Sequence, residues 1–170
     1  ETDLPLEAFS IQLEAEAAAA FERLTLDDLD DQLRWQDDAA WPNSFRRARF
    51  ASAVDLVNAD RMRRRAMQVM HERFAGLAAV LGPNYAGGML LLTNYTGQPQ
   101  LAFRSGFQQT PTRTLFGRPA QADGPAFRTP MATSLWAPLL EEGSLVALGH
   151  AIERELGVAD ERPPAFSNGA

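Results

Sequence analysis

Two histidines with neighbouring glutamates are the residues whose types could hold a metal ion. His150 and Glu153 are three residues apart in a predicted helix, and His71 is followed directly by Glu72. The chain has no cysteine and no His-Glu-x-x-His pattern, so no second group of ligands supports either pair. We interpret both pairs as surface positions on helices and expect neither a metal nor another cofactor.

Nucleophilic catalysis by a serine is the second possible chemistry, and the chain lacks residues that it requires. Serine, histidine and aspartate all occur, but no Gly-x-Ser-x-Gly elbow presents a serine. All sixteen basic residues are arginine and none is lysine. Arginine cannot replace a lysine base, because a guanidinium does not lose its proton near neutral pH. We therefore expect no catalytic residue within this chain.

Composition narrows the class of protein. The 170 residues are 45% hydrophobic, enough for one domain or part of one, and the formal charge is −6. A negative chain is a poor nonspecific ligand for nucleic acid, and no apolar run approaches the roughly 20 residues that span a bilayer. Glu1, Asp3 and Glu7 occupy positions where a secretory signal would be positive or apolar. These features predict a cytoplasmic protein with no nucleic-acid or membrane partner.

A turn between Thr93 and Pro99 is the most distinctive local pattern. Gly97 accepts positive φ, and Pro99 drives Gln98 towards extended geometry, so the chain must change direction there. Leu101–Phe103 then has the composition of a buried strand, which Ser105-Gly106 is expected to break. A turn that feeds a core strand explains this pattern without any functional role.

Helix and strand signals alternate along the chain, which predicts an α/β class with a mixed sheet and flanking helices. The predicted strands are short and continuously apolar, as in strands covered on both faces, so we expect the sheet to be incomplete on its own. Four helices are predicted: residues 11–24 capped by Ser10, a helix starting at Thr25, one from Pro42 and Ser44 to about residue 74, and one from Gly143 or Ser144 to residue 156. Strands are predicted over residues 77–81, 101–103 and 131–139. Loops are predicted over residues 84–88 and 111–130.

Several segments, in order, resemble amidase-signature hydrolases. The turn reads Asn-Tyr-Thr-Gly-Gln-Pro from Asn94, where that family usually has Asn, an aromatic residue or Leu, then Thr-Gly-x-Pro. The other similar segments are Trp41-Pro42-Asn43-Ser44-Phe45-Arg46-Arg47-Ala48-Arg49-Phe50, Ala53-Val54-Asp55, Ala59-Asp60-Arg61, Ser105-Gly106-Phe107, Ser134 to Gly143 before a final helix, and Glu161-Arg162-Pro163-Pro164-Ala165-Phe166.

The resemblance implies that residues 1–170 are a single region, the C-terminal third of an amidase-signature domain of α/β/α fold. In that family two serines and a lysine cleave C–N amide bonds, and they lie in an N-terminal portion that has no counterpart in this sequence. The resemblance also places a substrate channel near six residues of this chain. These expected substrate-binding residues are Asn84, Tyr85, Thr93, Asn94, Arg47 and Arg49.

Other interpretations of these residues stay open. Tyr85 and Asn94 could satisfy local backbone groups, and the arginines near residues 46–49 and 61–65 could form a solvated face paired with acids. Ala137-Pro138 stands where many family members have Gly-Arg, so any role of that arginine does not carry over. The chain could also be a free-standing interaction module or half of a split amidase. Expected partners are an N-terminal catalytic portion or complementary chain, a second copy, and a small amide substrate in the complete enzyme.

Overall fold

The computed structural model describes residues 4–84, 86–111 and 125–162, and it contains helices and one small sheet. These elements form two compact units. The first unit comprises Glu1–Arg73 and Gly88–Gly97, and the second comprises Phe74–Gly87 and Gln98–Ala170. The helix at Gly88–Thr96 returns to the first unit, which is why sequence order alone does not reveal the division.

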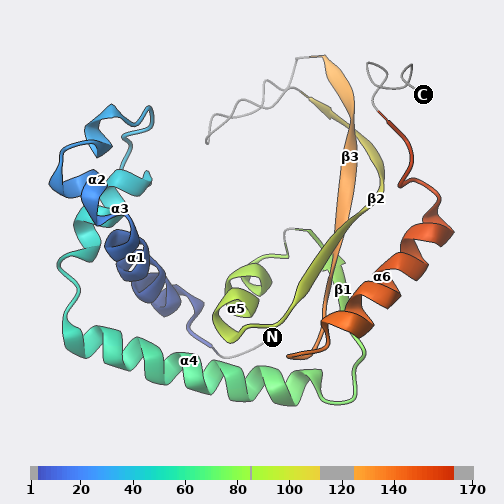
Figure 1. Ribbon diagram of the computed structural model, residues 1–170, viewed down its shortest axis with the longest axis horizontal. Coiled ribbons are helices and arrows are strands. Elements are labelled where there is room, and N and C mark those ends of the chain that lie inside the picture. The colour runs from blue at the N-terminus through green and yellow to red at the C-terminus, as the bar shows by residue number, and fades with distance from the viewer. Residues whose placement is uncertain (1–3, 85, 112–124, 163–170) are drawn as a thin grey trace. The chain divides into compact units, whose positions relative to one another are not determined.

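The first unit is helical. Its elements are η1 (Leu6–Ala8), α1 (Phe9–Ala20), α2 (Glu22–Leu26), η2 (Asp30–Gln32), α3 (Trp41–Ala48), most of α4 (Ala53–Phe74), and α5 (Gly88–Thr96) (Figure 1). Aromatic rings join these helices. Phe9 of α1 stacks on Tyr95 of α5 with 4.7 Å between ring centroids, and Phe45 of α3 lies 5.6 Å from both Phe21 and Trp41.

The helix predicted over residues 11–24 begins earlier and is interrupted. The chain enters α1 at Phe9 directly from η1, so Ser10 lies inside the helix and does not cap it. Phe21 leaves helical geometry at φ −106° while its N–H bonds to Ala17 O, and α2 follows. Thr25 lies within α2, so the helix predicted to start there was wrong.

The long helix predicted from Pro42 to residue 74 is two helices. Pro42 lies in the first turn of α3, as its fixed φ favours. The N–H groups of Phe50 and Ala51 then bond to carbonyls three residues earlier, which tightens and ends the turn. Ser52 caps the start of α4. Its Oγ accepts a hydrogen bond from the Asp55 N–H (3.1 Å), and Asp55 Oδ2 accepts one from the Ser52 hydroxyl (2.7 Å).

The second unit contains a three-stranded antiparallel sheet of order β1-β3-β2. Its strands are β1 (Val80–Pro83), β2 (Gln100–Pro111) and β3 (Ala126–Trp136), and the last two form a long hairpin beside α6 (Glu142–Leu156) (Figure 1). The expected mixed sheet was therefore wrong for the described strands. Ser105-Gly106 bends β2 by a register shift between Arg104 and Gly106 and does not end it.

The predicted loop over residues 111–130 was too wide. Pro111 ends β2, and Ala126–Pro130 belong to β3, which therefore begins before the predicted residue 131. Residues 112–124 lie outside the described residues. Pro130 is compatible with β3 because β1 pairs only with residues 133–136, so at Pro130 the strand has β2 alone as a neighbour.

The core of the second unit lies between the sheet and α6. Phe103, Leu135, Ala137 and Leu145 are buried together, and Leu101 packs against them. A helix within residues 143–156 was predicted correctly, and α6 ends at Leu156 before Gly157 in left-handed geometry (φ 64°). The strand predicted over residues 77–81 shares only Val80 and Leu81 with β1, and Leu81 is 62% exposed in the sheet that this chain forms.

Candidate functional site

The two arginines predicted to bind substrate make contacts near their own helix. Arg47 of α3 donates Nη1 to Asp38 O (2.8 Å) and Nη2 to Ser44 Oγ (3.0 Å). Arg49 reaches Glu22 Oε1 at 3.5 Å. These bonds tie α3 to the segments before it, so both guanidiniums have local structural partners.

Thr93 and Asn94 belong to α5, which continues through the beginning of the predicted turn. Thr93 is buried, and its hydroxyl donates to Met89 O (2.9 Å) within the helix. Asn94 is exposed. The change of direction comes at Gly97, whose N–H bonds to Thr93 O (2.8 Å) and whose φ of 85° favours glycine. The predicted turn is therefore confirmed at Gly97, one residue after α5 ends.

Tyr95 also anchors the first unit through polar contacts. Its hydroxyl accepts from the Leu13 N–H (3.0 Å), and its carbonyl accepts from Arg63 Nε (3.0 Å). Partial burial raises the pKa of the Tyr95 hydroxyl, while the Leu13 hydrogen bond opposes that rise. Sequence reasoning placed Tyr95 in the motif but did not identify this role, because its partners are far away in the chain.

Asn84 is the predicted site residue that the structure places in a new polar group. This Asn84 cluster consists of Asn84, Gln100 and Ser134, all in the second unit. Ser134 is fully buried on β3; its Oγ donates to Asn84 Oδ1 (3.0 Å) and accepts from Gln100 Nε2 (2.9 Å). Tyr85, the other residue predicted in this loop, lies outside the described residues.

The β-sheet register brings the Asn84 cluster together. Gly82 of β1 and Ala102 of β2 lie on opposite sides of Ser134, so the residues near these strand ends meet at β3. Trp136 lies two residues further along and is buried, and a Cβ on Gly82 would come within 3.1 Å of its ring. Glycine at position 82 thus lets β1 approach the indole closely.

The chemistry available to the Asn84 cluster is recognition by hydrogen bonds. The Ser134 hydroxyl is held between two carboxamides, neither of which is a base. Each carboxamide carries one further polar group: Nδ2 of Asn84 is a donor, and Oε1 of Gln100 is an acceptor. An amide group, which has one N–H donor and one carbonyl acceptor, is a ligand type that both of these groups can bind.

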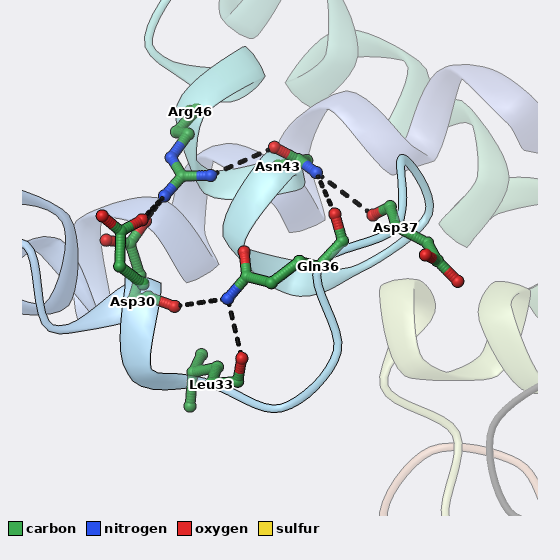
Figure 2. A network of polar contacts seen from close by, with 7 residues as sticks. Asp30, Leu33, Gln36, Asp37, Asn43 and Arg46 are labelled. Carbon is green, nitrogen blue, oxygen red and sulfur yellow. Dashed lines mark hydrogen bonds and ion pairs between the residues drawn. The ribbon is translucent and has the colours of Figure 1, made fainter.

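A second polar network, in the first unit, was missed by sequence reasoning. Arg46 of α3 lies 2.7 Å from Asp30 Oδ2 and 2.8 Å from Asp31 Oδ1, and its Nη1 donates to Asn43 Oδ1 (3.2 Å) (Figure 2). Asp30 is only 1% exposed, so its charge depends on Arg46 for compensation. The sequence indicated an arginine face that is solvated or paired with acids, and Arg46 does pair with acids, but one of them, Asp30, is buried.

The same network fixes the irregular chain between η2 and α3. Gln36 Nε2 donates to the carbonyls of Asp30 and Leu33, both at 2.8 Å, and Asn43 Nδ2 donates to the carbonyls of Gln36 (3.0 Å) and Asp37 (3.1 Å) (Figure 2). Side-chain amides thus bond to the carbonyls of Leu33 and Gln36 and add a second bond to those of Asp30 and Asp37, which also accept from backbone N–H groups. The arrangement is structural, since its donors are directed at the protein's own backbone.

Within residues 4–84, 86–111 and 125–162, no three histidine, cysteine or acidic side chains come together as metal ligands. No helix in those ranges combines the length and apolar character needed to cross a bilayer. His150 is exposed on α6, as expected for a surface position.

Comparisons with models of protein families, with curated proteins and with solved structures returned no match for this chain.

Proposed function

We propose that the chain is a substrate-channel portion of an amide hydrolase, with the nucleophile and its base supplied by residues outside the 170-residue sequence. The observation that carries the proposal is the Asn84 cluster, in which a buried serine orients two carboxamides. Their remaining donor and acceptor suit an amide group of the substrate. The ordered resemblance to amidase-signature hydrolases supports the same substrate class.

The residue types in this chain suit substrate binding and do not include the catalytic base. The chain has no lysine, so a Ser-Ser-Lys mechanism needs a lysine from elsewhere. The buried Ser134 contacts an amide on each side, which suits a positioning role and does not activate a nucleophile. The chain alone is thus expected to bind the substrate or line its channel, and not to catalyse amide hydrolysis.

The first experiment uses the purified 170-residue chain. A fluorophosphonate probe, which labels activated serines, should leave the chain unlabelled, and a chromogenic anilide should not be hydrolysed. Labelling or turnover that follows the chain through purification would contradict the proposal. Ser134→Ala provides the control, because loss of labelling in that variant would identify Ser134 as a nucleophile.

The second experiment reads the coding DNA upstream. A continuous frame encoding a Gly/Ser-rich loop and a lysine is expected, whereas a stop codon directly upstream would contradict a single-chain enzyme. In the joined protein, Asn84→Ala should lower kcat/KM for an amide about tenfold, the effect of one hydrogen bond worth about 1.4 kcal/mol. Asn58→Ala, an exposed asparagine on α4, is the matched control. Equal effects of the two variants would remove Asn84 from the site.

A second candidate, a noncatalytic interaction module, is supported by exposed apolar side chains. Phe50 is 90% exposed and Leu140 is 88% exposed. Such residues are typical of surfaces that bind another chain when they form contiguous patches. Absence of an upstream catalytic frame, with a stable folded chain, would favour this candidate.

A further inference from the structure

The segment that follows α6 is bound to both long strands of the second unit. Gly157 ends α6 in left-handed geometry, and beyond it Arg104 of β2 donates Nη1 to Glu161 O (2.9 Å) and Nη2 to Ala159 O. Arg128 of β3 donates both terminal nitrogens to the Glu161 carboxylate, with Nη2 3.1 Å from Oε2. The segment over residues 157–162 is thus held through its backbone by β2 and through the Glu161 carboxylate by β3.

An aromatic ring orders the two guanidiniums. The Arg128 guanidinium carbon lies 3.5 Å from the Phe107 ring centroid, and that of Arg104 lies 5.3 Å from it. The strand register explains the spacing, because Phe107 pairs with Pro130, two residues from Arg128. A stacked guanidinium is preorganised for a two-pronged contact with a carboxylate.

The charges around Glu161 favour its ionised form. The groups that face its carboxylate are Arg128 from β3 and Arg104 from β2, while Asp160 and Arg162 are its chain neighbours. The hydrogen bond from Arg128 lowers the pKa of the Glu161 carboxyl below its usual value, and desolvation opposes this only in part. Contacts of this kind hold at neutral pH and are lost as the pH falls through the lowered pKa of Glu161.

We propose that residues 157–162 form an electrostatic clasp, which Glu161 closes on the β2–β3 hairpin and which opens when its carboxylate is neutralised or screened. The clasp joins the end of α6 to strands whose pairing extends well beyond the part that α6 covers. Arg128 and Glu161 are each about half exposed, so dissolved salt reaches the contact. The clasp is therefore sensitive to both pH and ionic strength, unlike the apolar contact between α6 and the sheet.

The test uses the absence of cysteine from the chain. Cysteines introduced at the exposed positions Gln108 and Asp160 carry two spin labels, whose separation is measured by pulsed electron paramagnetic resonance. In this background the distance distribution is expected to be narrow at neutral pH and low salt. Glu161→Gln should broaden it about twofold or more, because a neutral amide replaces the charge-assisted contact of Arg128. Glu155→Gln, the same change at an exposed position on α6, should leave it narrow.

Further variants and conditions distinguish opening of the clasp from partial unfolding of the second unit. Arg128→Gln should reproduce the broadening, and 1 M salt or a pH below the lowered pKa of Glu161 should broaden the unsubstituted background while changing Glu161→Gln little. Far-UV circular dichroism confirms that each variant is folded. Equal distributions for Glu161→Gln and Glu155→Gln would overturn the proposal. Broadening by Arg104→Gln but not by Glu161→Gln would also overturn it, since backbone contacts would then hold the segment.

Discussion

Two neighbouring aspartates illustrate how differently the structure uses the same residue type. Asp30 and Asp31 both contact Arg46 Nη2, at 2.7 Å and 2.8 Å. The Asp30 side chain is 2% exposed, whereas that of Asp31 is 71% exposed. Water screens the second contact and can replace it, but the first has no such substitute. Burial, and not distance, therefore decides which contact matters.

We predict that Asp30→Asn lowers the free energy of unfolding by about 1 to 3 kcal/mol, because Arg46 loses its buried counter-charge while the side-chain shape is kept. Urea unfolding, followed by far-UV circular dichroism and tryptophan fluorescence, measures the change. Asp31→Asn is the matched control and should cost less than about 0.5 kcal/mol. Similar values for the two variants would show that the buried contact carries no special weight.

The six expected site residues show where residue-level prediction stops. Asn84 was predicted to bind substrate, and this stays a prediction; its partner in the structure, Ser134, lies fifty positions away and is brought there by strand register. No local spacing encodes that meeting. Arg47 and Arg49 were expected to face a substrate, yet Asp38, Ser44 and Glu22 contact them in the structure. Residue type indicated their chemistry without indicating their partners.

At the scale of elements, the residues that begin or end helices were predictable from the sequence, whereas breaks within a predicted helix were not. Pro42 at the start of α3, Gly97 after α5 and Gly157 after α6 act as their local chemistry requires. The break between α3 and α4 was missed, although Ser52 and Asp55 form a capping pair that can be recognised in the sequence. The long β2–β3 pairing was underestimated because proline and threonine at its far end resemble a loop.

The α6–sheet interface supplies a prediction at this scale. A Cβ on Gly149 would lie 2.1 Å from Leu101 Cδ2, so the leucine must move away from a packed site. Gly149→Ala should lower the free energy of unfolding by about 1 to 2 kcal/mol, because overpacking outweighs the helix preference for alanine. Thermal unfolding followed by circular dichroism measures this difference.

Gly143, also in α6, is the matched control for Gly149. A Cβ there would meet nothing within 4 Å. Gly143→Ala should therefore raise the free energy of unfolding by about 0.5 to 1 kcal/mol, because alanine favours the helix and restricts the unfolded chain. If both variants are stabilised, α6 does not pack on Leu101 as tightly as the structure has it.

At the scale of the whole molecule, surface character and charge act in opposite directions. The chain carries a formal charge of −6, which favours solubility, but large apolar side chains are exposed in both units. Phe50 in the first unit and Leu140 in the second are almost fully exposed. Water contact with such groups is unfavourable, and association with another apolar surface removes it.

We therefore predict that the isolated chain self-associates, to a degree that rises with concentration and with salt, since salt screens the repulsion between negative chains. Size-exclusion chromatography with light scattering should give a mass above the 18.7 kDa of one copy at high concentration. The double variant Phe50→Ser/Leu140→Ser should shift the equilibrium towards the monomer, whereas Asn58→Ser/Asn94→Ser, at exposed polar positions, should not. A mass of one copy at every concentration and salt would contradict the prediction. It would mean that exposure of these side chains does not drive association of the free chain.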